Sequence, residues 1–273
     1  MATPDTTNRT SIYYTGLSEG GGPDQFPSIH ERLDSVGFHV TPISFSSLTC
    51  PAPLIAFLQE QREKLRHYPQ RARPWLYHEL HNPWSPAASV YDSWQFLELC
   101  QAPFLITQLK ALLGQHIILY DSQWLESPWS SKEDKLQKSE AHRFPVEPLA
   151  GVTAFVYFDD AANERTYIEY QESCQTGSAE MHAGSVIIIG SEVRYTIHSN
   201  GAKTPSIYVI RYFPASSLYS RHPASPAQAL LTLRYPLLNY SRLPLWLVCG
   251  EDQADNDFVT GFETRSGFWA RPQ

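Results

Sequence analysis

Two side chains between residues 183 and 215 have the chemistry to hold a metal-bound acid. His198 ends an alternating run that begins at Val193, and Arg211 lies near the end of the next β-branched run, from Ser206 to Phe213. A neutral imidazole binds divalent metal ions, and a guanidinium binds a carboxylate through paired hydrogen bonds. If both side chains face one pocket, they could hold a dicarboxylic acid that also chelates a metal.

The elements around these two residues read as short strands. Ser185 to Ile189 is a β-branched aliphatic run that follows Gly184, and it is too short for a helix. Residues 199–201 form a Ser-Asn-Gly turn signal, and Pro214 ends the last strand. The pattern therefore predicts consecutive strands joined by short turns, with His198 at a strand end.

Residues 68–92 are rich in proline, histidine and aromatic side chains. The segment is too irregular for one element and too aromatic for a solvated linker, so we expect it to line a substrate pocket through Trp75, Tyr77, His78 and Trp84. His78 and His81 have a spacing that suits a metal on a helix face. The flanking prolines disfavour such a helix and favour a pocket wall or plain packing.

Composition excludes several classes of function. The chain of 273 residues has a net charge of -7 and no lysine or arginine cluster, so nucleic acid is not an expected partner. No apolar run approaches the length of about 18 residues that a membrane span needs, and the first residues lack a secretory signal pattern. The cysteines are scattered, which is typical of reduced thiols in a cytoplasmic protein.

The order of elements predicts an α+β protein with a sandwich or barrel core. We expect a lead-in over residues 1–25 and one domain over residues 26–273. This domain has a helical part at 29–114, a β-core at 115–215 and a C-terminal extension at 216–273. The helices are expected near residues 29–37, 51–67 and 94–114, and the main strands near 116–124, 152–158 and 167–170. The extension either caps the barrel or forms a contact in a homodimer.

Four segments in this order resemble one protein family. They are SVGFHV, PFLITQLKALLGQHIIL, VTAFVYFDDAANE and GSVIIIG, the last followed by His198 and Arg211. Over residues 29–215 the chain resembles the phytanoyl-CoA dioxygenase-like family of non-haem Fe(II)/2-oxoglutarate-dependent oxygenases. The resemblance implies a double-stranded β-helix core, which is a cupin-like jelly roll with N-terminal helices packed on it.

The resemblance also implies an iron site. Family members bind iron through a His-x-Asp/Glu motif and a distal histidine, and a basic residue beyond that histidine grips 2-oxoglutarate. His198 matches the distal histidine and Arg211 the basic residue, with Lys203 as the alternative grip. His142 matches the first histidine.

The chain departs from the family at the carboxylate ligand, because Phe144 stands where the motif has Asp or Glu. Glu140 is the preferred substitute, since it would share a face with His142 in an extended segment. Glu147 is a second substitute, and a site without any protein carboxylate is the remaining alternative.

The resemblance implies an Fe(II)/2-oxoglutarate-dependent dioxygenase that hydroxylates or cyclises a small organic molecule such as a secondary metabolite. The missing carboxylate motivates two other interpretations. One is an isomerase or cyclase that uses His142, Glu140 and His198 for acid–base catalysis. The other is a small-molecule-binding protein with a degenerate metal site.

Overall fold

The computed structural model describes residues 45–69, 73–125, 140–159, 166–172, 175–199, 206–234 and 239–258. The helix expected at 29–37 lies outside these residues. The α-helices are α2 (Ala52–Lys64), α3 (Arg73–Leu76), α4 (Ser93–Cys100), α5 (Pro103–Leu113) and α6 (Pro226–Arg234). Short 3-10 helices are Leu65–His67, Pro86–Ser89, Glu140–Arg143 and Tyr240–Arg242.

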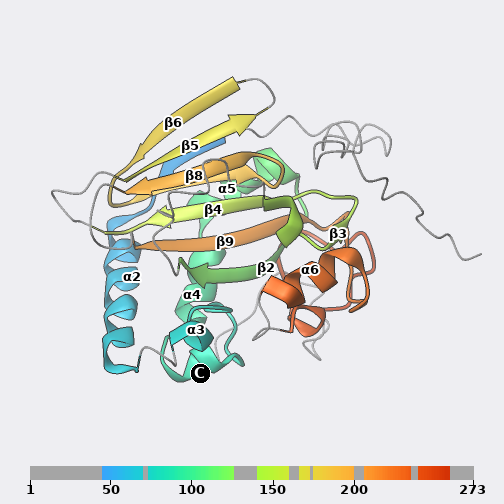
Figure 1. Ribbon diagram of the computed structural model, residues 1–273, viewed down its shortest axis with the longest axis horizontal. Coiled ribbons are helices and arrows are strands. Elements are labelled where there is room, and N and C mark those ends of the chain that lie inside the picture. The colour runs from blue at the N-terminus through green and yellow to red at the C-terminus, as the bar shows by residue number, and fades with distance from the viewer. Residues whose placement is uncertain are drawn as a thin grey trace, which may run out of the picture.

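The strands form two facing antiparallel sheets and a small ribbon (Figure 1). The larger sheet has the order β1-β7-β4-β9-β2-β11, the second has the order β6-β5-β8, and β10 pairs with β3. The strands are β1 (Phe45–Thr49), β2 (Ile117–Trp124), β3 (Val146–Glu147), β4 (Val152–Tyr157), β5 (Thr166–Glu172), β6 (Gln175–Met181), β7 (Ser185–Gly190), β8 (Arg194–Ser199), β9 (Ile207–Pro214), β10 (Leu218–Tyr219) and β11 (Trp246–Cys249).

Strand alternation divides the side chains into separate cores. Inward positions such as Phe155, Ile187 and Val209 on the large sheet pack against Ile168 and Ile197 on the small sheet. These residues make the interior of the jelly roll, because each strand directs alternate side chains to opposite faces. The α+β jelly-roll architecture expected from the sequence is therefore confirmed.

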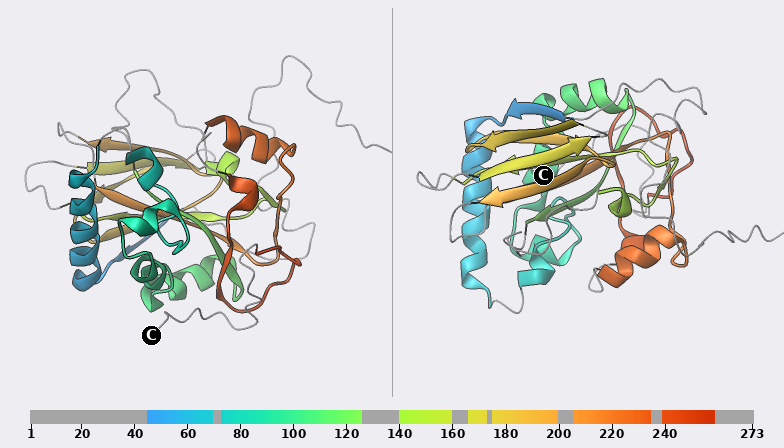
Figure 2. Two further views of the ribbon diagram at one scale, coloured as in Figure 1. Left: turned by 90° about the horizontal axis from the view of Figure 1, so that it is seen from below. Right: turned by 45° about the horizontal axis from the view of Figure 1, so that its top comes forward.

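Helices α2 to α5 cover the outer face of the large sheet, as the views from below and from above show (Figure 2). Their apolar faces join the outward side chains of β2, β4 and β9 in one core. Asp92 caps the N-terminus of helix α4, because its carboxylate accepts a hydrogen bond of 3.1 Å from the backbone N–H of Gln95. Helix α5 begins with Pro103 and ends at Gly114, which has a positive φ of 87°.

Among the described helices, none is long and apolar enough to cross a membrane alone. Helices α4 and α5 satisfy the length and composition criteria only as a pair, and they bend by 49° at the break between them. The residues they bury, such as Phe96 and Leu105, lie in the core against the large sheet.

Strands β8 and β9 follow each other along the chain, as predicted, but they lie in different sheets. Strand β8 pairs with β5, and β9 pairs with β2 and β4. No pattern in the sequence predicted β6, α6 or β11. Strand β11, from the C-terminal extension, extends the large sheet by pairing with β2.

Candidate functional site

Three neighbouring strands place polar side chains in one row inside the jelly roll. On β9, Arg211 lies directly opposite Asp121 of β2 on one side and Thr153 of β4 on the other. Strand partners present their side chains on the same face of a sheet. All three residues are at most 1% exposed, and β2 adds the buried polar side chains of Ser122 and Gln123.

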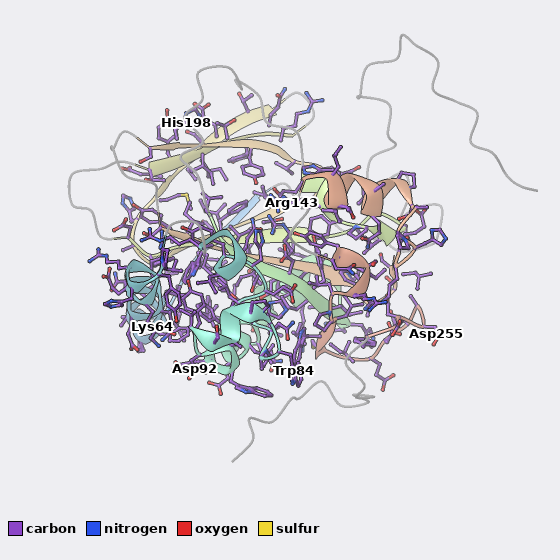
Figure 3. The ribbon with its side chains drawn as sticks, turned by 60° about the horizontal axis from the view of Figure 1, so that its bottom comes forward. Lys64, Trp84, Asp92, Arg143, His198 and Asp255 are labelled. Carbon is purple, nitrogen blue, oxygen red and sulfur yellow. The ribbon has the colours of Figure 1, made fainter. Side chains whose placement is uncertain are left out.

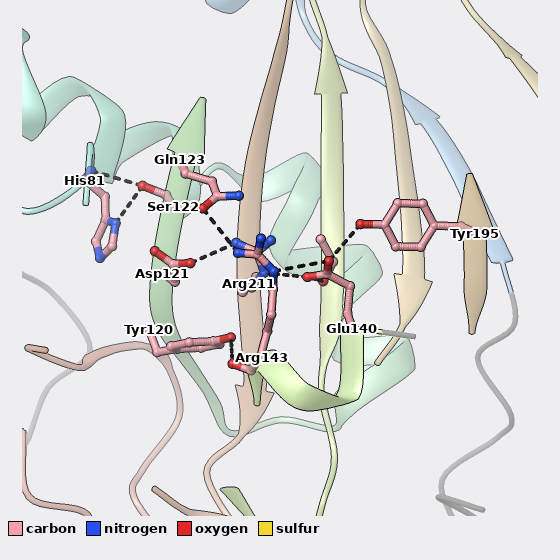
Figure 4. Close-up of polar contacts among 10 residues, drawn as sticks. His81, Tyr120, Asp121, Ser122, Gln123, Glu140, Arg143, Tyr195 and Arg211 are labelled. Atoms are coloured by element: carbon pink, nitrogen blue, oxygen red, sulfur yellow. Dashed lines mark hydrogen bonds and ion pairs between the residues drawn. The ribbon is translucent and has the colours of Figure 1, made fainter. Parts of the chain in front are cut away.

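Arg211 forms two buried ion pairs (Figure 4). Its Nε donates to Oε2 of Glu140 at 2.7 Å, and its Nη1 donates to Oδ2 of Asp121 at 2.8 Å. Burial acts to lower the pKa of Arg211, but the carboxylates of Glu140 and Asp121 raise it well above its usual value. The guanidinium is therefore charged, and its Nε and Nη1 are engaged by acids of the chain itself.

The carboxylate of Glu140 is the centre of this network. Besides Arg211, it accepts a hydrogen bond of 2.7 Å from the Tyr195 hydroxyl and one of 3.5 Å from Oγ1 of Thr153. Nε of Arg143 lies 3.5 Å from Oε1 of Glu140. Burial acts to raise the pKa of Glu140, but Arg211 and Arg143 outweigh burial and lower it from 4.5 to about 2. Glu140 is therefore ionised at neutral pH.

His78 and Gln123 extend the network along β2. His78 forms an isolated bridge with Gln123, and the backbone N–H of Trp124 donates to the carbonyl of Tyr77 at 2.8 Å, so this segment runs beside the end of β2. Nη1 of Arg143 donates to Oε1 of Gln123 at 3.3 Å. Burial lowers the pKa of His78 to about 4, so its imidazole is neutral near pH 7.

His198 lies on the other side of the small sheet from this network. Tyr195 and Ile197 of β8 point inward, and His198 alternates to the outer face (Figure 3). Its ring stacks on Tyr167 of β5 with centroids 4.6 Å apart, and its Nε2 is 3.0 Å from a carboxylate oxygen of the exposed Glu169. The expected grouping of His198 with Arg211 is therefore not formed.

His142 and Glu140 come from one 3-10 turn, Glu140–Arg143. Of these two residues, Glu140 enters the buried network around Arg211. His142 is half-buried. Phe144, at the position of the missing carboxylate, packs edge-on against Tyr120 with ring centroids 5.4 Å apart. A Cβ atom at Gly151 would overlap the Phe144 ring, so glycine is required there for the ring to fit. Phe144 is thus a core residue.

The expected pocket wall is divided among different surroundings. His78 reaches the interior, whereas Tyr77 belongs to the core under the helices, where the Arg62 guanidinium lies 5.8 Å from its ring centroid. Trp84 is 55% exposed and stacks on Trp246 with centroids 5.6 Å apart. A common pocket wall is therefore not formed by these three. Lys203 and the side chain of Trp75 lie outside the described residues.

An iron ion needs several ligand atoms directed at one point. Within the described part of the chain, no group of three His, Cys, Asp or Glu residues has that arrangement. His198 faces outward, and both oxygens of Glu140 accept bonds from Arg211 and Tyr195. The described residues therefore do not fit a three-ligand iron centre, and the metal roles of His142, His198 and Glu140 stay predictions.

Sequence reasoning missed most of the residues that Arg211 meets. The signals were present in two strands: Asp121 interrupts the apolar run of β2, and Tyr195 alternates in phase with Val193 and Ile197. A charged residue inside an apolar strand is costly unless it is paired. An in-phase acid on one strand and an in-phase arginine on another therefore indicate a buried ion pair.

Comparisons with known proteins reveal the fold. No family model matches the sequence, and no curated protein matches it. Among solved structures, the apo non-heme monooxygenase ThoJ aligns over 81% of this chain and 84% of its own, with a TM-score of 0.52 and 13% identity. CytC3, solved with Fe(II) and alpha-ketoglutarate, aligns over 84% of this chain and 90% of its own, with a TM-score of 0.51 and 12% identity. The chain therefore has the jelly-roll fold of these proteins, and membership of the phytanoyl-CoA dioxygenase-like family stays a prediction.

Proposed function

We propose that the protein binds a small dicarboxylic acid, in the first place 2-oxoglutarate, inside its jelly roll and acts on a small organic molecule. The observation that carries this proposal is the carboxylate cradle, which we define as Arg211, Tyr195 and Thr153 around one buried carboxylate. A guanidinium and two hydroxyl groups are the donors that a carboxylate ligand needs in a dry site.

The fold supports 2-oxoglutarate as the first acid to test. CytC3, which has the same fold, was solved with Fe(II) and alpha-ketoglutarate. In this chain the cradle lies in the interior between the two sheets, on strands β4, β8 and β9. The finer proposal is oxidation of a small organic molecule, hydroxylation or ring closure, with 2-oxoglutarate as co-substrate and Fe(II) as the metal.

A second candidate function does without iron. The outward direction of His198 and the engagement of Glu140 by Arg211 favour a protein that binds a small acid without redox chemistry. We derive no catalytic step through iron, since the described residues do not supply three ligands.

Binding and turnover separate the two candidates. Purified wild type is titrated with 2-oxoglutarate in the absence of oxygen, with and without Fe(II), and succinate is then measured after oxygen is admitted. An oxygenase forms succinate only when Fe(II) is present, whereas a binding protein binds the acid and forms none.

Arg211→Lys is the matched variant, because it keeps a positive charge and loses the planar fork. We expect its affinity for 2-oxoglutarate to fall by at least about tenfold, the loss of roughly one charge-assisted hydrogen bond. Circular dichroism confirms that the variant is folded. If the folded wild type binds no dicarboxylic acid at all, the proposed function is wrong.

A further inference from the structure

The carboxylate cradle is filled by the chain itself. Glu140 enters it from the 3-10 turn Glu140–Arg143, while Arg211, Tyr195 and Thr153 come from three different strands (Figure 4). Glu140 is only 3% exposed, so its carboxylate is held almost out of solvent. Its contacts are the ones that a free carboxylate would make in the same place: 2.7 Å to Arg211 Nε and 2.7 Å to the Tyr195 hydroxyl.

The side chain of Glu140 is also the right chemical fragment. A glutamate side chain is a CH2–CH2–COO⁻ group, and one end of 2-oxoglutarate, glutarate or succinate is the same group. A site that accommodates this fragment from Glu140 has the donors and the volume for the same end of a free acid. The cradle therefore selects acids that carry a carboxylate on a two-carbon arm.

Charge balance prevents both carboxylates from occupying the cradle together. Arg211 and Arg143 face Glu140 and Asp121, so two buried cations meet two buried anions. An added anion would stay buried without a partner, which is strongly unfavourable. Asp121, 2.8 Å from Nη1 of Arg211, keeps the guanidinium in position when Glu140 is absent.

We propose that Glu140 is a tethered ligand that closes the carboxylate cradle, and that a free dicarboxylic acid binds only by displacing it. The inference rests on the proposed function and adds a means of regulation, because any event that withdraws the Glu140–Arg143 turn would open the site. Acid affinity is then set by competition with a covalently attached copy of the ligand's own carboxylate arm.

The test removes the tether and measures acid binding. Glu140→Ala deletes the carboxylate and one methylene, and Glu140→Gln keeps the volume but removes the charge. Glu98→Ala, at an exposed position of helix α4, is the matched control. Binding of 2-oxoglutarate, succinate and propionate to each folded protein is measured by calorimetry at pH 7 with a chelator present.

We expect Glu140→Ala to bind 2-oxoglutarate at least tenfold more tightly than wild type, and Glu140→Gln to lie between them. Propionate, which carries only the shared arm, should raise the melting temperature of Glu140→Ala and leave that of Glu98→Ala unchanged. If Glu140→Ala does not fold, Glu140→Gln alone decides, since it must still bind acids more tightly than wild type.

The possible failures differ from one another. Wild type and both Glu140 variants binding 2-oxoglutarate equally would overturn the tether and leave the proposed function standing. A complete lack of acid binding in wild type and in every folded variant would overturn both. Tight binding by the Glu140 variants with none by wild type would establish the tether and overturn the proposed function, which requires that wild type binds the acid.

Discussion

Replacing Arg211 by methionine should destabilise the protein strongly at neutral pH. The variant removes the guanidinium from two buried carboxylates, Glu140 and Asp121, and Glu140 keeps only the longer contact of 3.5 Å with Arg143. Removing one member of a buried ion pair typically costs about 3–5 kcal/mol, because the remaining charge has lost both water and partner. We expect a loss of this size in the free energy of unfolding.

The pKa of Glu140 gives a second route to the same magnitude. Its pKa falls from 4.5 to about 2, with Arg211 as the largest cause that opposes burial. At about 1.4 kcal/mol per pKa unit, the shift corresponds to roughly 3 kcal/mol in favour of the ionised form. This contribution is present above pH 4.5, the unfolded value, and is lost as the pH falls through the folded value, so it is complete at pH 7.

Urea unfolding at pH 7, followed by tryptophan fluorescence and circular dichroism, measures the loss. Arg66→Met is the matched control: Arg66 also forms an ion pair of 2.7 Å, with Glu63, but both side chains are more than half exposed. Exposed pairs contribute about 0–1 kcal/mol. The reasoning is wrong if Arg211→Met and Arg66→Met lose the same small amount of unfolding free energy, with the same dependence of that free energy on urea concentration as wild type. Burial would then not set the strength of the network.

Three further predictions follow from other parts of the structure. Burial lowers the pKa values of His78 and His81 from 6.5 to about 4. The unfolded chain therefore binds protons first as the pH falls, and stability drops between pH 6.5 and 4 by roughly 3 kcal/mol per histidine. Urea midpoints at pH 7 and pH 4 check this, and His81→Asn should remove about half of the loss. Gly151→Ala should lower stability by about 1–3 kcal/mol, because its methyl group overlaps the Phe144 ring; thermal unfolding measures it, and Phe144→Leu in the same background should recover part. His198→Ala, on the outer face, should change acid affinity by less than about twofold and stability by less than about 1 kcal/mol, whereas a tenfold loss of affinity in calorimetry would place His198 in the site.

Local sequence patterns were sufficient for most of the core elements. Strands β2, β4, β7 and β9 lie within a residue or two of the predicted ranges, since their β-branched runs are bounded by glycine, proline or turn residues. Helices α4 and α5 lie within the helical range predicted near residues 94–114. Pro103 marks the start of α5 and Gly114 its end. Strand β6, with the sequence QTGSAEM, has no apolar alternation to indicate it.

The alternation of residues in β8 indicates which face of the sheet His198 occupies, but the match to the family motif did not use it. Val193, Tyr195 and Ile197 occupy alternate positions and are buried, which leaves His198 in phase with Arg194 on the opposite face. A single residue of shift in a strand exchanges its two faces. Matching a histidine to a family motif by order alone ignores that phase, and the phase decides which side of the sheet the imidazole reaches.

The sequence indicates that Arg211 meets a buried acid, but not which acids of the chain surround it. Glu140 lies 71 residues away along the chain and Asp121 lies 90 residues away, so both pairings depend on how the strands are arranged in the sheets. Alternation with Val209 and Phe213 does indicate that Arg211 points inward. The identity of the acid that meets it is a property of the tertiary fold.

Stability and ligand binding are expected to oppose each other at this cradle. A displacing acid has to replace the contacts of Glu140 with Arg211, Tyr195 and Thr153, so the free energy of these contacts is subtracted from its own binding free energy. The tenfold difference expected between Glu140→Ala and wild type corresponds to a competition of about 1.4 kcal/mol. The gain in acid affinity of Glu140→Ala reports on the contacts of Glu140, whereas the loss of unfolding free energy in Arg211→Met also includes the ion pair with Asp121. We therefore expect the loss in Arg211→Met to be the larger of the two free energies.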